Sequence, residues 1–179
     1  IGAAAPVAWF EKISDTTLME NFYLSELVAA ESSVREMADK FGKGGSGFLG
    51  MDELFAWKKL SDFLLLMHGR GIHFRDLSGG NLLISQDNER RVQFVLIDTG
   101  RLRVYEQPLP MSKRISDLVR VCNKMSTAGR DQFMSNYLAK HGGKFGLKER
   151  LQLSIYDLKV ILKRRFGRKY IKRFLSVGK

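Results

Sequence analysis

The stretch GIHFRDLSGGNLLI, residues 71–84, decides the fold of this 179-residue chain. Apolar residues at helical spacing precede it over residues 51–68, and a second informative stretch, VLIDTGR, follows at residues 95–101. The segment QDNE at residues 86–89 separates the two stretches and is typical of a turn. We therefore expect a long helix, a loop and a β-hairpin in that order.

Three polar residues of these stretches have a spacing that suits phosphoryl transfer. Asp76 follows an arginine, Asn81 stands five residues later, and Asp98 opens an Asp-x-Gly sequence after the second strand. Such a reaction needs a carboxylate beside the attacking hydroxyl and hard oxygen ligands for Mg²⁺. Asp76 would orient the hydroxyl and take its proton, while Asn81 and Asp98 would hold Mg²⁺. Leu83 would form an apolar floor under the adenine of ATP.

Each piece of this pattern is weak alone, since a lone Asp at a loop start is usually a cap or turn residue. The combined order matches the catalytic loop and metal-binding motif of kinases. The two stretches resemble the lipopolysaccharide kinases of the Kdo/WaaP family, as do residues 114–118 and the segment YLSELV at residues 23–28. The resemblance covers about residues 5–120 and implies a protein-kinase-like fold.

The resemblance also assigns roles to residues outside the three-residue pattern. It implies that adenine meets backbone groups of Glu26 and Val28, and that Asp117 supports the backbone of the catalytic loop. Arg75 is expected to steady this loop or a neighbouring acidic group. The cofactors implied are ATP and Mg²⁺.

The chain departs from the protein-kinase pattern at three positions. Phe74 stands where protein kinases usually carry histidine, Ser78 where Ser/Thr kinases place a lysine on the transferred phosphate, and Thr99 where the Asp-Phe-Gly motif has phenylalanine. Ser78 in particular argues against a protein kinase. No glycine-rich phosphate loop with its strand lysine and helix glutamate precedes residue 5. We therefore expect Ile1 to fall inside the small lobe, and this chain alone to transfer phosphate poorly.

The sequence predicts an α+β fold with a mostly helical body. We expect strands at residues 7–13, 18–28, 82–85 and 92–97, and helices at residues 31–41, 51–68, 116–126, 130–140, 148–165 and 168–174. Residues 1–28 would be the end of the small lobe and the hinge. Residues 29–179 would be the large lobe, with the catalytic loop and basic C-terminal helices.

Nearly all of the net charge of +11 lies at the C-terminus, where residues 144–179 carry 12 Lys/Arg against 2 Asp/Glu. In residues 158–175 apolar and basic residues alternate at helical spacing. Two interpretations stay open: a surface for anionic lipid or glycolipid, and a terminal helix with a solvated basic face. A nucleic-acid partner is not favoured, because no binding module is recognisable.

Composition also bears on the compartment. The single cysteine, Cys122, cannot form an internal disulfide, and neither a signal peptide nor a membrane span is recognisable. We expect a cytoplasmic protein, peripheral on the inner membrane.

The resemblance implies an ATP-dependent kinase that phosphorylates a sugar hydroxyl, of heptose or Kdo, in the lipopolysaccharide inner core. One alternative is another kinase-like enzyme acting on a small molecule, or a KEOPS-type protein kinase. The other is a catalytically inactive pseudokinase scaffold.

Overall fold

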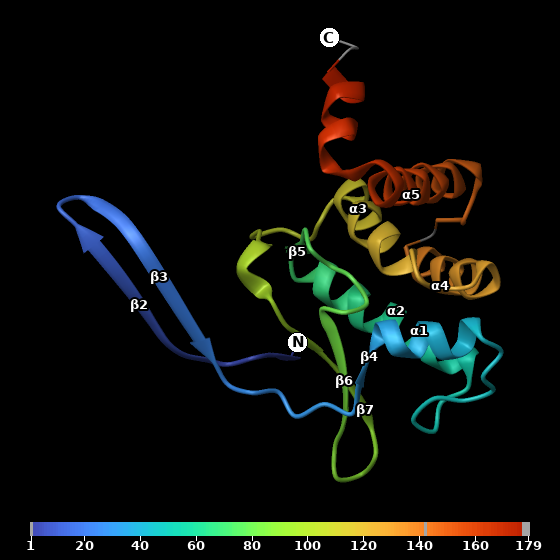
Figure 1. Cartoon of the computed structure of the whole chain (residues 1–179). Coiled ribbons are helices and arrows are strands. Elements are labelled where there is room, and N and C mark those ends of the chain that lie inside the picture. The colour runs from blue at the N-terminus through green and yellow to red at the C-terminus, as the bar shows by residue number, and fades with distance from the viewer. Residues whose placement is uncertain (1, 142, 177–179) are drawn as a thin grey trace.

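In the described part of the chain, five α-helices form the body and small sheets lie along one side of it (Figure 1). The computed structural model describes residues 2–141 and 143–176, except for the side chains of residues 164 and 166–176. The helices are α1 (Val34–Gly42), α2 (Glu53–Gly69), α3 (Met111–Cys122), α4 (Thr127–Ala139) and α5 (Leu147–Ser176), with a 3-10 turn η1 (Thr99–Arg101). The strands are β1 (Gly2–Ala3), β2 (Pro6–Ser14), β3 (Thr17–Ser25), β4 (Ser32–Ser33), β5 (Ile72–Phe74), β6 (Leu82–Gln86), β7 (Val92–Leu96) and β8 (Leu102–Val104).

Helix α2 is the central element of the core. The Asp52 carboxylate accepts a hydrogen bond from the Phe55 amide at 2.8 Å and so begins the helix. Its apolar face is fully buried and packs mainly against α4. Burial of each such side chain stabilises the fold by about 1.5–3 kcal/mol. The predicted helix at residues 51–68 is confirmed, with its start fixed by this cap.

The hairpin β6–β7 is the middle of a four-stranded sheet with the order β1-β7-β6-β4. Leu82 pairs with Leu96 in an antiparallel register, which confirms the predicted strand pair. The short strand β1 joins the edge of β7 in parallel, and β4 joins the edge of β6. Strands β5 and β8 form a separate antiparallel pair next to the end of α2.

The hairpin β2–β3 extends away from the helices (Figure 1). Almost all of its side chains are exposed. It confirms the strands predicted on either side of residues 14–17. Strand β3 ends at Ser25, so residues 26–28, which we expected in the strand, form an extended segment without ladder pairing. The division into lobes at residue 28 stays a prediction.

Three predicted helix starts need correction. Helix α4 begins at Thr127 instead of residue 130, after the Ser126 cap. Helix α1 begins at Val34 instead of residue 31, because Ser33 and Glu36 form a capping box. Helix α3 begins at Met111, five residues before the predicted start, directly after Pro110. Pro110 has an extended backbone, and the helix starts at the next residue.

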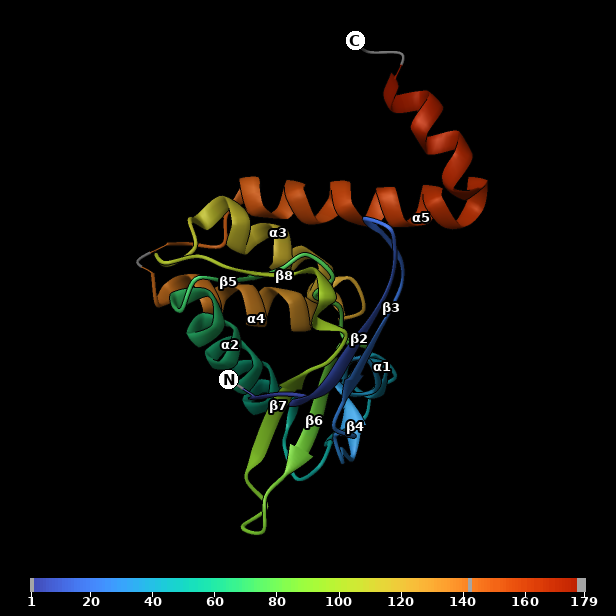
Figure 2. The ribbon, with the colours of Figure 1, turned by 90° about the vertical axis from the view of Figure 1, so that its left-hand side faces the viewer.

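The two helices predicted at residues 148–165 and 168–174 form one helix, α5. An interior glycine such as Gly167 costs a helix only about 1 kcal/mol, which does not end one of this length. The helix bends towards its C-terminal end (Figure 2). The predicted alternation of apolar and basic side chains beyond residue 165 concerns side chains that lie outside the described part of the structure. No helix in the described part of the chain combines the length and apolar character needed to cross a bilayer.

Candidate active site

Gly71 connects α2 to the strand that carries the candidate catalytic loop. Its φ is +73°, a conformation that favours glycine. A Cβ at this position would lie 2.1 Å from the Tyr105 carbonyl oxygen. The Gly71 carbonyl accepts a hydrogen bond from the Tyr105 amide at 3.0 Å, so the turn between α2 and β5 is fixed against the chain after β8.

The fully buried carboxylate of Asp117, on α3, supports the chain just before Asp76. It accepts a hydrogen bond from the Phe74 amide at 2.9 Å. His73 Nε2 lies 3.2 Å from Asp117 Oδ1, and His68 Nε2 lies 3.5 Å from Oδ2, neither with the alignment of a hydrogen bond. The supporting contact expected of Asp117 is therefore confirmed.

His68 extends this support into the helical core. Its Nδ1 lies 2.6 Å from the Tyr137 hydroxyl of α4, and that hydroxyl also accepts a hydrogen bond from Arg114 at 3.5 Å. Burial lowers the pKa of His68, against the opposing effect of Asp117. Burial raises the pKa of Tyr137 to about 12. A neutral imidazole and a neutral phenol thus join three helices beneath the loop.

The hairpin register brings Asn81 and Asp98 to the same end of β6–β7. The Ile97 amide donates to the Asn81 carbonyl at 3.1 Å, one residue before Asp98. The side-chain amide of Asn81 donates to the Asp76 carbonyl at 2.9 Å, which leaves its Oδ1 for another partner. Asp98 has φ 54° and ψ 48°, a left-handed conformation that Asp tolerates better than most residues.

Arg101 contacts the carboxylate of Asp76 at both oxygens. Its Nε lies 3.2 Å from Oδ2, and its Nη1 donates to Oδ1 at 3.3 Å. The Arg101 side chain is 74% exposed, so solvent reaches this pair. Arg75, to which we assigned a steadying role, is exposed, and its side chain has no hydrogen bond or ion pair with the described part of the chain. Its role stays a prediction.

A cavity of about 660 Å³ brings together the residues expected to hold ATP. It is lined by Ala4, Tyr23, Ser25, Glu26, Leu27, Val28, Leu83, Ile97, Asp98, Thr99 and Gly100. The Glu26 amide donates to the Ala5 carbonyl at 2.8 Å, which leaves the Glu26 carbonyl for an adenine amino group. The backbone of Val28 makes no hydrogen bond to another backbone group among the described residues. Leu83 and Ile97 supply an apolar surface for a purine.

The oxygen donors near this cavity suit Mg²⁺ bound together with a nucleotide, and they do not suit a metal whose ligands all come from the protein. No group of three or more His, Cys, Asp or Glu side chains that could hold a metal occurs among the described residues. Asp98 offers a carboxylate and Asn81 an amide oxygen. Mg²⁺ is usually bound through one or two carboxylates together with water and substrate phosphates. The residues therefore fit a metal that arrives with a nucleotide.

The N-terminal end of helix α1 contacts the candidate catalytic loop at Gly79 and Gly80. The Arg35 amide donates to the Gly79 carbonyl at 2.9 Å, and a Cβ on Gly80 would lie 2.4 Å from the Arg35 guanidinium. The sequence reasoning gave no role to Arg35 or Arg101. The only signal for Arg101 was its place in the second motif, and nothing in the local sequence pointed to Arg35.

No family model and no curated protein matches this chain. Among solved structures, WaaP in complex with acyl carrier protein is similar with a TM-score of 0.63. The similarity covers 91% of this chain and 69% of the WaaP chain, at 15% identity. The chain has a WaaP-like kinase fold. The resemblance drawn from the two motifs is thereby confirmed at the level of fold. The similarity in fold assigns no role to a single residue, and the proposed residue roles depend on the contacts described for this chain.

Proposed function

We propose that this protein is an ATP-dependent phosphotransferase that phosphorylates a sugar hydroxyl, of heptose or Kdo, in the inner core of lipopolysaccharide. The observation that carries the proposal is the local linkage of three residues: Asn81 bonds to the Asp76 carbonyl and to the Ile97 amide, and the next residue, Asp98, lines the cavity of about 660 Å³. The WaaP-like fold supports the reaction class, and the resemblance of the two motifs to lipopolysaccharide kinases supports the acceptor.

When bound, ATP supplies the phosphoryl group, and Mg²⁺ neutralises charge on its phosphates. Glu26 and Val28 would bind adenine through their backbone, with Leu83 beneath the ring. Asn81 and Asp98 would hold the metal through oxygen atoms.

Asp76 would accept the proton of the acceptor hydroxyl as the new bond from oxygen to phosphorus forms and ADP leaves. Its carboxylate keeps free lone pairs while paired with Arg101, because each oxygen can accept more than one hydrogen bond. Arg101 would orient the carboxylate through its two contacts. We further propose action on the cytoplasmic face of the inner membrane, because the acceptor is a glycolipid and the C-terminal region is strongly basic.

The test uses protein expressed from its complete gene, labelled ATP, Mg²⁺ and dephosphorylated core oligosaccharide. We expect label on the sugar, and a loss of about 100-fold or more in the Asp76→Asn variant, because a general base contributes at least that much. Asp39→Asn, which changes an exposed carboxylate on α1, is the matched control and should transfer normally.

Other results would change the assignment. Label on protein or on a different acceptor would keep the kinase and reject the substrate. Absence of both transfer and Mg-ATP binding would support a pseudokinase scaffold. Full activity in the Asp76→Asn variant would reject Asp76 as the base.

A further inference from the structure

The outer face of α5 carries an apolar stripe, which we define as Leu151, Ile155, Leu158 and Leu162. These four side chains are between 38% and 58% exposed. At 3.6 residues per turn they fall within about 60° of one another around the helix axis. Leu153, on the opposite side of the helix, is buried and anchors α5 to the core. The apolar stripe therefore lies on the solvent side of α5, with Ile155 at the edge nearest α3, whereas an ordinary surface helix has a polar outer face.

Lysines accompany the apolar stripe. Lys148, Lys159 and Lys163 are exposed on one flank of it. They belong to the C-terminal region that holds 12 Lys/Arg against 2 Asp/Glu, while the rest of the chain is almost neutral. An outward apolar face beside clustered lysines is the arrangement of helices that lie in the interface of an anionic membrane. A groove for a neutral protein helix would not need this charge.

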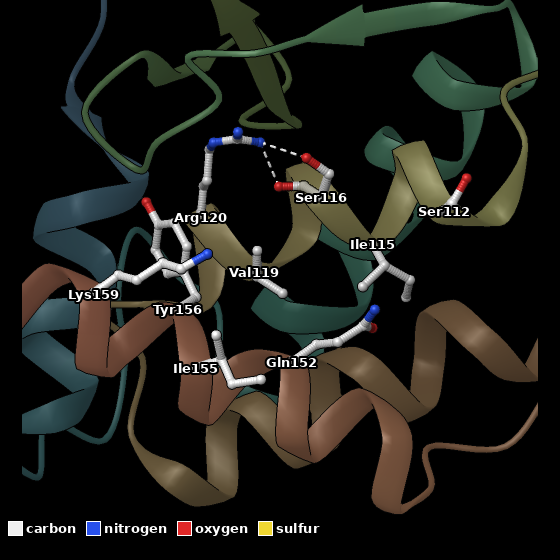
Figure 3. Close-up of a pocket in the computed structure, with 9 residues that line it drawn as sticks. All are labelled: Ser112, Ile115, Ser116, Val119, Arg120, Gln152, Ile155, Tyr156 and Lys159. Carbon is white, nitrogen blue, oxygen red and sulfur yellow. Dashed lines mark hydrogen bonds between the residues drawn. The ribbon is translucent and has the colours of Figure 1, made fainter. Parts of the chain in front are cut away.

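A cavity of about 300 Å³ opens between α3 and α5 beside the apolar stripe (Figure 3). Its apolar wall is made by Ile115, Val119 and Ile155, and its cations are Arg120 and Lys159. Ser112, Ser116, Gln152 and Tyr156 complete the lining with polar groups. Mixed walls of this kind suit an amphipathic anion such as the phosphate headgroup of a lipid.

Arg120 has donors available to such a headgroup. Its Nη1 donates to the hydroxyl of Ser116 at 3.0 Å and lies 3.4 Å from Asp117 Oδ1 (Figure 3 shows the bonds to Ser116). Its other guanidinium nitrogens make no hydrogen bond with the described residues. The headgroup would therefore be held one side chain away from Asp117, the residue that supports the catalytic loop.

We propose that α5 and the cavity between α3 and α5 form a docking site for anionic phospholipid. The apolar stripe enters the acyl region, and a headgroup phosphate binds at Lys159 and Arg120. This docking site rests on the membrane location in the proposed function and assigns it to particular residues. Docking can be tested separately from phosphate transfer, because vesicle binding is measured without ATP or acceptor.

The experiment is flotation of the full chain with vesicles made of one part phosphatidylglycerol and two parts phosphatidylcholine, compared with phosphatidylcholine alone. We expect binding to the anionic vesicles only. Lys159→Glu should weaken it by about fivefold or more, since each lysine near the surface contributes that much. Leu158→Glu should abolish it. Lys43→Glu, the same charge change in the exposed loop after α1, should bind as the parent does.

Each variant is compared with the parent by thermal unfolding, so that a folding defect is recognised; Leu158→Ser replaces Leu158→Glu if the latter does not fold. Equal binding to both vesicle types, or no binding, would overturn the proposal. So would parent-like binding of both the Leu158 and Lys159 variants. Binding of soluble glycerol phosphate without vesicle binding would identify a site for free anions and also overturn it.

Discussion

At the scale of single residues, Asp98 is the proposed carboxylate ligand of Mg²⁺ and has an unusual backbone conformation. Its left-handed conformation is tolerated by Asp and Asn because a short polar side chain can hydrogen-bond locally. Asp98→Asn should therefore change the free energy of unfolding by less than about 0.5 kcal/mol, as an exposed substitution does. It should nevertheless strongly weaken Mg²⁺-dependent nucleotide binding, because a carboxylate ligand is lost.

Urea unfolding and titration with a fluorescent ATP analogue, with and without Mg²⁺, measure the two effects of Asp98→Asn. Asp39→Asn serves again as the control. Unchanged Mg²⁺ dependence in the Asp98 variant would contradict its role as a metal ligand.

Arg101 contacts the carboxylate of Asp76, so its loss should affect the reaction more than the fold. A solvent-exposed ion pair contributes at most about 1 kcal/mol to stability. A misoriented catalytic group, however, costs up to about 100-fold in rate. We expect Arg101→Ala to lower kcat by about 10-fold to 100-fold, with Arg101→Lys intermediate because it keeps the charge but loses the fork of donors.

Arg75→Ala is the informative comparison for Arg101→Ala, since Arg75 is exposed beside the same aspartate and does not contact it. Steady-state kinetics with the core acceptor provide the measurement. A larger loss of kcat in the Arg75 variant than in the Arg101 variant would show that Arg75, and not Arg101, positions the loop that carries Asp76.

At the scale of elements, the turn from α2 to β5 depends on one glycine. Gly71→Ala should destabilise the protein by about 2 kcal/mol or more, because the left-handed conformation alone costs an L-residue about 1–2 kcal/mol. The new Cβ would also meet the Tyr105 carbonyl at 2.1 Å. Because β5 leads directly to Asp76, phosphate transfer should fall too.

Gly69→Ala is a matched control two residues away. Gly69 lies at the end of α2, and a Cβ there would meet nothing within 4 Å. Alanine is the better helix former, so this variant should be as stable as the parent or more stable by up to about 1 kcal/mol. Equal unfolding midpoints in urea for the two variants would show that the Gly71 turn does not constrain the fold.

At the scale of the whole molecule, a buried polar network ties α2, α3, α4 and β5 together. His68 faces Asp117 and Arg114 from α3, Tyr137 from α4 and His73 from β5. Its pKa is lowered from 6.5 by burial. Below about pH 6.5 the His68 imidazole is protonated in the unfolded chain but stays neutral in the folded chain. The free energy of unfolding therefore falls as the pH decreases.

This loss should begin below about pH 6.5 and reach at most about 1.4 kcal/mol per pH unit for one proton. Above that pH the group contributes no pH dependence. Urea unfolding between about pH 7.5 and pH 5.5 measures the slope, which His68→Gln should reduce. His141→Gln should reduce it less, since His141 is exposed on the surface. An unchanged slope in the His68 variant would contradict the assignment.

The sequence by itself determined the local order of the site. The spacing of Asp76, Asn81 and Asp98 around a predicted hairpin was sufficient, because strand register within a short hairpin follows from the turn and the alternation of buried residues. Helix α2 was also predictable, since it has a strong apolar period and an acidic cap.

Only the tertiary structure decided contacts between distant segments. His68 and Tyr137 are 69 residues apart, and Arg101 reaches Asp76 across 25 residues. The cavity between α3 and α5, and the outward direction of the apolar stripe, depend on which face of α5 packs on the core. The spacing of apolar residues in the sequence shows which side chains share a face of the helix. The packing of neighbouring elements decides which face is buried and which is exposed to solvent.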